Sequence, residues 1–313
     1  MRSFIASLLA ASCTLGALVL PMPSAAASFS FAAIGDVPYG PVEELGELAQ
    51  RINRVAPAFT IHVGDIKSGG SVCSDEAFAT VRRLFDQFEQ PLVYTPGDNE
   101  WTDCHRRSCG QYDPLERLDK LRTMFFATEQ SLGKRKLTLQ TQAAQNGFGK
   151  YVENRRWAVG KVSFVTLHLV GSNNNWQPEL PSVSEYAARD EANIAWLRDS
   201  FARAKARKDV AIVLAMQADT FYGEPKADSG FTRWLAALAE EVDSWGKPVL
   251  LIQGDTHVHR IDQPLKNAKG KPLPQLTRVV VPGEHKPDAV MITVDDERIE
   301  QPFSLRLLGL SAP

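Results

Sequence analysis

The chain has 313 residues, of which 44% are hydrophobic and 23% are charged, proportions typical of a soluble globular protein with one large α/β domain or two small ones. Its formal net charge of −2 at pH 7 gives no reason to expect electrostatic binding to nucleic acid or to an anionic membrane.

The first 27 residues differ in composition from the rest of the chain. Arg2 gives a positively charged start, Phe4–Val19 is mostly apolar, and Ala25-Ala26-Ala27 matches the small-residue site of signal-peptide cleavage. The apolar stretch is short, so a permanent membrane anchor is the less favoured interpretation. We therefore expect residues 1–27 to be an export signal, residues 28–313 to form a single domain, and the protein to be periplasmic or secreted.

Beyond the export signal, predicted strands alternate with predicted helices. Phe29–Ile34, Phe59–Val63 and Leu92–Pro96 are short apolar runs, typical of buried strands. Two sets of apolar residues at helical spacing lie between them: Leu45, Leu48, Ile52 and Val55, then Phe78, Val81, Phe85 and Phe88. This order predicts parallel strand–helix–strand units.

The rest of the chain continues the same alternation. A helix is predicted over Pro114–Phe126 and an irregular or hairpin insertion over Leu137–Lys150. The later predicted elements are, in chain order, a strand at Val162–Val170, a helix at Glu185–Lys208, a strand at Val210–Met216, a helix at Phe231–Val242 and a strand at Val249–Gln253. The tail offers three short runs suited to a sheet edge: Val279–Val281, Ala289–Val294 and Phe303–Leu307.

Four glycine–aspartate loops each follow a predicted strand: Gly35-Asp36, Gly64-Asp65, Gly97-Asp98 and Gly254-Asp255. A single such pair suits a turn, but in an open α/β sheet ligands bind just beyond the carboxyl ends of the strands. Carboxylates delivered there would repel one another, and bound divalent cations would offset that repulsion. The four loops together therefore predict a metal site.

The order of these loops resembles the calcineurin-like metallophosphoesterase superfamily, which includes the purple acid phosphatases. The family pattern is Asp-x-His, Gly-Asp, Gly-Asn-His-Asp/Glu, a lone histidine at a strand end, and Gly-His-x-His. The matching stretches here are Asp36-Val37-Pro38-Tyr39, Gly64-Asp65, Gly97-Asp98-Asn99-Glu100, Gln217 and Gly254-Asp255-Thr256-His257. The resemblance spans Asp36 to His257 and implies a four-layer α/β sandwich, with two mixed β-sheets flanked by helices.

The resemblance also implies two divalent metal ions and an activated water that attacks phosphorus. Asp65 would bridge the two ions and take part in catalysis, and Asn99 falls on the catalytic position that protonates or steadies the leaving group. The implied metal ligands are Asp36, Asp65, Asp98, Gln217, Asp255 and His257.

The chain departs from the family pattern at several positions. Pro38 replaces the first histidine, and Tyr39 beside it either binds the first metal ion in its place or packs on the turn. The second site loses its nitrogen ligands, which favours Mg²⁺, Mn²⁺ or Ca²⁺ over the Zn²⁺ that imidazoles prefer. The metals to be tested are therefore Mn, Mg, Ca, Fe and Zn.

Asn99 cannot donate a proton as an imidazolium can, and a positioned general acid typically contributes ~10²–10⁴-fold. Either another group protonates the leaving oxygen, with His105 and His259 nearest by sequence, or the substrates have good leaving groups. The other histidines have structural explanations: His62 and His168 lie within apolar strands, and His285 lies in a polar loop.

Three cysteines, Cys73, Cys104 and Cys109, follow the export signal. Export makes a disulfide plausible, and the odd number leaves one thiol over. Cys73 and Cys104 each follow a Gly-Asp loop, so they could pair near the rim of the site. The local pair Cys104–Cys109 is the alternative.

These patterns predict a metal-dependent hydrolase of phosphate mono- or diesters that acts on a small phosphorylated substrate. The histidines missing at Pro38 and Asn99 support an alternative, a catalytically weakened protein that binds metal or a phosphorylated ligand on the same scaffold. The chain has no Gly-x-Ser-x-Gly elbow, which argues against a serine hydrolase.

Overall fold

The computed structural model describes residues 28–176, 182–223 and 228–309. The predicted export signal and Cys13 within it lie outside these ranges. Within them, no helix combines the length and the apolar character needed to cross a membrane.

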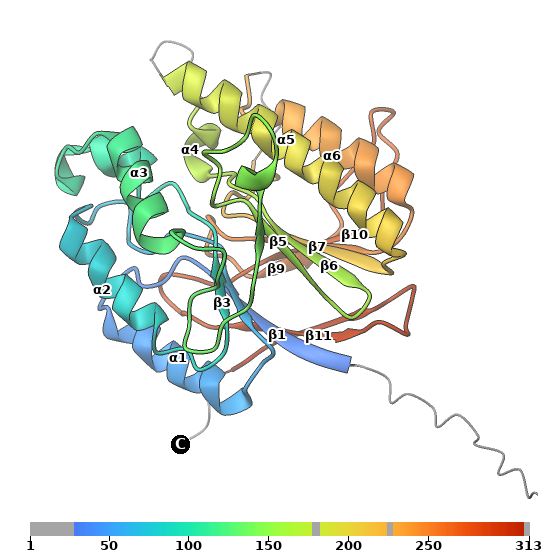
Figure 1. Cartoon of the computed structure of the whole chain (residues 1–313), viewed down its shortest axis with the longest axis horizontal. Coiled ribbons are helices and arrows are strands. Elements are labelled where there is room, and N and C mark those ends of the chain that lie inside the picture. Colours follow the sequence, from blue (N-terminus) through green and yellow to red (C-terminus); the bar gives the residue numbers. More distant parts are fainter. Residues whose placement is uncertain (1–27, 177–181, 224–227, 310–313) are drawn as a thin grey trace, which may run out of the picture.

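Two mixed β-sheets form the centre of the molecule (Figure 1). The first has five strands in the order β12-β11-β1-β2-β3, and the second has seven in the order β4-β5-β6-β7-β8-β10-β9. The strands are β1 Ser28–Ile34, β2 Thr60–His62, β3 Leu92–Tyr94, β4 Gln140–Thr141, β5 Arg155–Val159, β6 Val162–Thr166, β7 Ala211–Ala215, β8 Val249–Gln253, β9 Arg260–Asp262, β10 Leu276–Val280, β11 Val290–Asp295 and β12 Phe303–Leu307.

Helices cover the outer face of each sheet, which gives four layers. Helices α1, α2 and α3 pack on the first sheet, and α5 and α6 pack on the second (Figure 1). The helices are α1 Glu43–Val55, α2 Asp75–Phe85, α3 Pro114–Phe125, α4 Gly171–Asn174, α5 Ser182–Arg207 and α6 Thr232–Trp245, with 3₁₀ turns at Thr102–His105, Arg107–Cys109 and Gln142–Ala144. The predicted α/β sandwich of two mixed sheets flanked by helices is confirmed.

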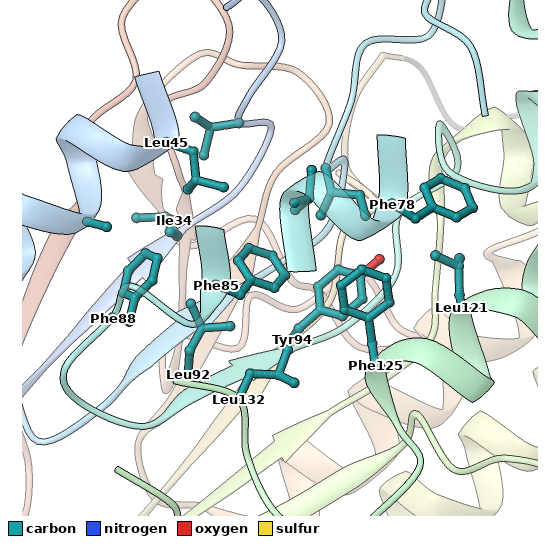
Figure 2. Close-up of a cluster of buried hydrophobic side chains, with 14 of the residues drawn as sticks. Ile34, Leu45, Phe78, Phe85, Phe88, Leu92, Tyr94, Leu121, Phe125 and Leu132 are labelled. Atoms are coloured by element: carbon teal, nitrogen blue, oxygen red, sulfur yellow. The ribbon is translucent and has the colours of Figure 1, made fainter. Parts of the chain in front are cut away.

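Three apolar clusters hold the layers together. One lies between α1–α3 and the first sheet, where Phe85 of α2 and Tyr94 of β3 pack beside Phe125 of α3 (Figure 2). A second fills the space between the two sheets, with Phe31 and Phe164 in edge-to-face contact, and the third lies under α5 and α6. Burial of these side chains fixes the relative position of the sheets, and hence of the loops at their ends.

Local sequence explains where the helices of the first layer begin. The Ser74 side chain accepts a hydrogen bond from the Ala77 amide at the start of α2, and Asp113 does the same for Glu116 at the start of α3. Pro114 occupies the first position of α3, where a missing N–H has no cost. Strands β1, β2 and β3 are parallel, as the alternation of strand and helix predicts.

The prediction that the tail forms sheet edges is wrong for two of its three strands. Strand β10 lies between β8 and β9, and β11 lies between β12 and β1, so only β12 is an edge. Strand β10 is largely buried on both faces, whereas β11 buries the face of Val290, Ile292 and Val294 and leaves Thr293 on the other face exposed. Strands β5 and β9 were not predicted, because the arginines of β5 and the exposure of β9 hide the usual apolar pattern.

Candidate metal centre

The four Gly-Asp loops lie at the carboxyl ends of strands that run parallel to a neighbour, as predicted. Asp36, Asp65 and Asp98 follow β1, β2 and β3 of the first sheet, and Asp255 follows β8 of the second. The site therefore lies at one edge of the sandwich, where the loops that follow strands of both sheets come together.

Direct contacts join the four aspartates into one cluster. The Asp255 amide donates a hydrogen bond to Asp36 Oδ1 at 3.0 Å. The Gln217 carboxamide nitrogen donates to Asp65 Oδ2 at 3.2 Å and to Asp98 Oδ1 at 3.1 Å. Asp36, Asp65 and Asp98 are buried, while Asp255 is partly exposed. Side chains from distant parts of the chain thus share one polar site.

Two glycines permit this close approach. A Cβ atom on Gly171 would lie 2.7 Å from Asp255 Oδ1 and 2.9 Å from Asp98 Oδ2. A Cβ atom on Gly97 would overlap the Asp65 carboxylate. Since any side chain at either position would displace a carboxylate, glycine is needed at both.

The backbone of the site is unusual at four of its side chains. Asp36, Asp65, Asp255 and His257 have φ angles of 52°, 57°, 72° and 59°, in the left-handed region that residues other than glycine rarely occupy. Such conformations persist where the surrounding structure holds them, and they cluster at functional sites. Here they turn the carboxylates and the imidazole toward one another at the strand ends.

One group of side chains has the geometry of a cation site. Ligand atoms of Asp36, Asp65 and His257 all lie within 4.8 Å of one another. Asp36 Oδ2 and His257 Nε2 are buried and have no hydrogen-bond partner in the described part of the chain. Buried polar atoms without partners are rare and call for an explanation, and a cation between these two atoms would supply one.

Glu284 orients the imidazole of this group and was not among the predicted site residues. Its carboxylate lies 3.0 Å from His257 Nδ1, which leaves Nε2 facing Asp36 at 3.4 Å. A carboxylate on the far nitrogen is the usual support of a metal-binding histidine. The sequence held a usable indication, because Gly283-Glu284 follows strand β10 just as the Gly-Asp pairs follow theirs.

Asp65 occupies the middle of the cluster, and every hydrogen bond that it accepts from the described residues comes from a neutral group. Tyr39 donates its hydroxyl to Asp65 Oδ2 at 2.7 Å, and the Asn99 carboxamide donates to the same oxygen at 2.8 Å. The Asn99 amide adds a bond to Oδ1 at 3.2 Å. The Tyr39 ring also packs edge-on against His257, with ring centroids 4.6 Å apart. Tyr39 therefore lies within the cluster, and its role as a metal ligand stays a prediction.

Gln217 lies in the cluster, but it presents its nitrogen to the carboxylates. Its Oε1 accepts a hydrogen bond from the Gly171 amide, while Nε2 bridges Asp65 and Asp98. Binding a cation through Oε1 would require the carboxamide to turn over and give up the bond to Gly171. The role of Gln217 as a ligand stays a prediction that carries this cost.

Ser172 contacts the cluster from the loop after β6, a contact that was not predicted. Its hydroxyl donates to Asp98 Oδ2 at 2.7 Å. The adjacent run Asn173–Asn175 packs away from the carboxylates. The side-chain oxygen of Asn174, for instance, accepts a bond from Arg189, and Asn175 donates to Glu185.

Glu100 joins the loop after β2 to the loop after β3. Its Oε1 accepts bonds from the Gly97 amide at 2.7 Å, the Tyr94 hydroxyl at 2.7 Å and the Asp65 amide at 3.2 Å. Its other oxygen is buried with no partner among the described residues. Glu100 thus fixes the backbone at Asp65 and Gly97.

No protein-family model and no curated protein matches the sequence. Solved structures do match. A dimetal phosphatase from Danio rerio is 13% identical with a TM-score of 0.51, over 85% of this chain and 95% of that chain. PhoD is 12% identical with a TM-score of 0.54, over 90% of this chain and 68% of that chain. The chain has the calcineurin-like metallophosphoesterase fold.

A purple acid phosphatase from yellow lupin (Lupinus luteus) seeds shares the fold as well. It is 14% identical with a TM-score of 0.51, and the match covers 88% of this chain and about half, 51%, of that chain. The layout predicted from the order of the Gly-Asp loops is therefore confirmed. At such low identity the likeness concerns the fold, and the chemistry has to be argued from the residues of this chain.

Burial and mutual repulsion dominate the electrostatics of this metallophosphoesterase-fold site. Burial raises the pKa of Asp65 well above its ordinary value, and the neighbouring charges of Asp98, Glu100 and Asp36 raise it further. Burial and the charges of Asp98 and Asp36 also raise the pKa of Asp255 to about 7. These shifts express one fact: the carboxylates are buried close together, so their charged forms repel one another.

The pKa of His257 is raised, whereas burial alone would lower the pKa of an imidazole. Burial lowers its pKa, but the close approach and the charge of Asp36, at 3.4 Å from Nε2, and the contacts with Glu284 outweigh burial and raise the pKa to about 9. In the absence of metal the imidazolium is therefore the one cation of the cluster. A divalent ion would have to displace its proton in order to bind Nε2.

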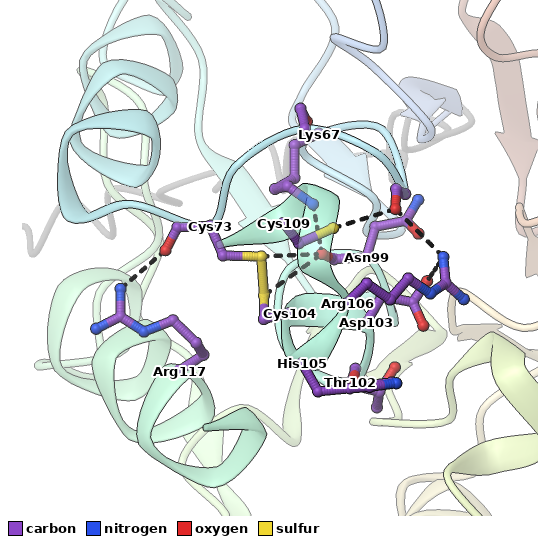
Figure 3. The surroundings of a disulfide bond; sticks show 12 residues. Lys67, Cys73, Asn99, Thr102, Asp103, Cys104, His105, Arg106, Cys109 and Arg117 are labelled. Atoms are coloured by element: carbon purple, nitrogen blue, oxygen red, sulfur yellow. Dashed lines mark hydrogen bonds and ion pairs between the residues drawn. A yellow bond between two sulfur atoms is a disulfide. The ribbon is translucent and has the colours of Figure 1, made fainter. Parts of the chain in front are cut away.

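A disulfide lies at the rim of the site. Cys73 is bonded to Cys104, so the pairing near the rim is confirmed, and the local Cys104–Cys109 alternative is wrong (Figure 3). Cys109 is a buried free thiol. Both disulfide sulfurs contact the Asn99 backbone carbonyl at 3.6–3.7 Å, and Lys67 Nζ donates to the same oxygen at 2.7 Å. The bridge thus fixes the loop that carries Asn99.

Three of the other histidines bond backbone carbonyls, which gives no support to a proton-transfer role for them. His105 Nδ1 bonds the Thr102 carbonyl, and His259 Nδ1 bonds the Val280 carbonyl. Neither bonds a candidate metal ligand within the described ranges. His62 is buried and bonds the Val37 carbonyl, as expected of a core histidine. No imidazole other than His257 therefore contacts the aspartates in the described structure.

Proposed function

We propose that this protein is a metal-dependent hydrolase of phosphate mono- or diesters, with a binuclear centre and a small phosphorylated substrate. The observation that carries the proposal is the convergence of the four carboxylates of Asp36, Asp65, Asp98 and Asp255 on a single imidazole, that of His257, in the described part of the chain. Among the described residues, His257 alone forms an ion pair with any of the four. The phosphatase structures that share the fold support the same activity.

The donor atoms fit two divalent ions of unequal character. Asp36, Asp65 and His257 would hold the first ion, at the site where two buried atoms lack partners. Asp65, Asp98 and Asp255 offer only oxygen to the second ion, a set that suits Mg²⁺, Mn²⁺ or Ca²⁺. Asp65 belongs to both sets, which supports its role as the bridge. We expect the first ion to bind more tightly than the second.

Bound cations would supply an activated water and would stabilise charge on the phosphoryl oxygens. The chain itself supplies hydrogen bonds beside them. Asn99 and Tyr39 both present donors at Asp65 Oδ2, and metal binding there would free them to bind a phosphate oxygen. Because Asn99 replaces an imidazole, we expect esters with good leaving groups to be the better substrates.

A second candidate function, a weakened metal- or phosphate-binding protein, is favoured by one observation. Three neutral side chains, Tyr39, Asn99 and Gln217, already donate hydrogen bonds to Asp65, so the cluster is partly satisfied without metal. Metal bound in stoichiometric amount with no hydrolysis of any ester would favour this function over the first.

The test is an assay of chromogenic phosphate mono- and diesters with Mn²⁺, Mg²⁺, Ca²⁺, Zn²⁺ and iron. We expect hydrolysis that depends on metal and that is lost in Asp36→Asn. Asp262→Asn, an aspartate outside the cluster that pairs with Arg278, is the matched control and should keep its activity. Equal activity in Asp36→Asn and Asp262→Asn would rule out the assigned centre.

We further propose that the protein is exported and that residues 28–313 form its single mature domain. The Cys73–Cys104 disulfide supports export, because such bonds persist in oxidising compartments. Expression of the full chain in a bacterium should place the protein in the periplasm or medium, with Ser28 at its N-terminus. An unprocessed cytoplasmic product would contradict this proposal.

A further inference from the structure

A groove of about 390 Å³ adjoins the metal centre and shares Tyr39 with it. Its walls come from Pro38–Val42, the loop after β1, and from Ile66–Val81, the loop after β2 together with the first part of α2. Its volume falls in the range of ligand pockets in proteins, ~300–1,000 Å³. The Tyr39 hydroxyl bonds Asp65, so one side chain borders both the carboxylates and the groove.

The groove exposes more apolar than polar surface. Val42 and Val72, from the two opposite walls, are 39% and 48% exposed, and they are among the large hydrophobic side chains that the described surface leaves open. Phe78 and Val81 lie beneath them as buried residues of α2. An apolar group in the groove would therefore remove apolar surface from water on both sides.

The charged residues of the groove already have partners. Lys67 Nζ donates to the Ser68 and Asn99 carbonyls, at 2.8 Å and 2.7 Å. Glu76 pairs with Arg83 at 2.9 Å. An anionic substituent of a ligand would have to draw the Lys67 ammonium away from these two carbonyls, and it would lie in the same groove as the Glu76 carboxylate. We therefore expect a second phosphate or a carboxylate to bind less well here than an uncharged group.

We infer that this groove binds the alcohol part of the substrate, and that the substrates are phosphate esters of uncharged, apolar alcohols, aromatic ones in particular. This inference rests on the proposed function, since it needs the phosphate to lie at the carboxylate cluster beyond Tyr39. The asparagine at position 99 agrees with it, because phenols leave more readily than alkyl alcohols when no group donates a proton.

The inference is tested first by binding, which does not depend on turnover. Phenylphosphonate, 4-propylphenylphosphonate and 4-carboxyphenylphosphonate are titrated by calorimetry into the full protein in the presence of Mn²⁺. We expect the propyl compound to bind about tenfold more tightly than the phenyl compound, and the carboxy compound to bind more weakly than both. Equal affinities, or tightest binding of the carboxy compound, would overturn the inference.

Substitutions locate the effect. Val42→Ser and Val72→Ser should each remove most of the propyl advantage, and Val42→Ser places a favoured residue at the N-cap of α1, so the fold is preserved. Val55→Ser is the matched control, since Val55 is 43% exposed and lies outside the groove. A propyl advantage that survives in both groove variants would place the apolar site elsewhere and reject the groove.

Turnover of the corresponding phenyl phosphates separates this inference from the proposed function. If the groove is right and the function is wrong, the propyl advantage in binding appears and is lost in the valine variants, while no ester is hydrolysed. If the function is right and the groove is wrong, all three esters are hydrolysed without the expected order. Each result therefore decides one of the two claims.

Discussion

Two buried acidic regions of this molecule solve the same electrostatic problem differently. Glu153 is fully buried and bonds Arg122 at 2.6 Å and His168 Nδ1 at 3.0 Å. Burial raises its pKa, but the charge of Arg122 and the contact with His168 hold the pKa well below the usual value. At the candidate metal centre, by contrast, burial and like charges raise the pKa of Asp65 and Asp255.

The two regions differ in whether the chain itself supplies the cation that neutralises the buried carboxylates. The Glu153 carboxylate has its cation within the chain, so it is complete as folded and acts as a structural element. The aspartates of the candidate metal centre have one imidazole and several neutral donors among the described residues. A buried carboxylate without a cation is costly, and binding a metal ion would remove that cost. Predictions that separate the two regions test this interpretation.

The largest expected effect is at the shared ligand of the two proposed ions. Asp65→Asn should lower the metal-dependent activity by roughly 10³-fold or more, because a bridging charge is worth several kcal/mol. The thermal stability of the metal-free variant should be equal to or above that of the wild type, because a repulsive charge is removed. Steady-state kinetics and calorimetry on the two proteins measure both quantities.

At Glu153 we expect the opposite pattern, with a loss of stability and no change in metal binding. Glu153→Gln leaves Arg122 with a weakened partner in a buried position and should lower the free energy of unfolding by about 3 kcal/mol. Metal affinity per folded molecule should stay the same. Urea unfolding measures the first quantity and metal titration the second. A Glu153→Gln variant with the wild-type free energy of unfolding but a weakened affinity for metal would reverse the roles assigned to the two regions.

A smaller effect is expected from a residue that touches one proposed ligand. Ser172→Ala removes the hydrogen bond to Asp98 and should weaken metal binding by about tenfold, the lower end of the range for groups that orient ligands. Ser304→Ala, on the exposed surface of β12, is the control. If the two variants bind Mn²⁺ alike in a calorimetric titration, Ser172 has no part in holding Asp98.

The last prediction concerns the pH dependence of the stability of the metal-free protein. Without metal, the folded state holds the proton of Asp255 up to a pKa of about 7 and that of His257 up to about 9, above the ordinary values of 3.8 and 6.5. The folded state therefore binds more protons than the unfolded state from pH 4 to 9, and its stability falls as the pH rises.

Melting temperatures in EDTA should accordingly decrease from pH 5 to pH 9, and saturating Mn²⁺ should reduce the decrease. Asp255→Asn should flatten the lower half of the range in the metal-free protein. A metal-free melting temperature that rises with pH over this window would show that the aspartates are not held at raised pKa values.

Much of the centre could be predicted because short-range rules fix it. A Gly-Asp pair after an apolar run places a carboxylate at a strand end, and parallel strands bring those ends together, so Asp36, Asp65, Asp98 and Asp255 converge as predicted. The four-layer fold follows from the same alternation of strands and helices.

What could not be predicted depends on side-chain orientation and on long-range contacts. The amide face that Gln217 presents is decided by the Gly171 amide, which lies 46 residues away in sequence. Ser172 reaches Asp98 through a left-handed turn, with φ at 50°, that a serine seldom adopts. The inner position of β10 is decided by its pairing with β8, which the short apolar pattern does not encode.

Metal stoichiometry decides whether the converging aspartates form a metal site. Elemental analysis of the purified protein, followed by titration of the metal-free form with Mn²⁺, should find at least one tightly bound ion per chain. The tight binding should disappear in Asp36→Asn and Asp65→Asn and persist in Glu153→Gln. A wild type that binds no metal, or Asp36 and Asp65 variants that bind it normally, would contradict the account.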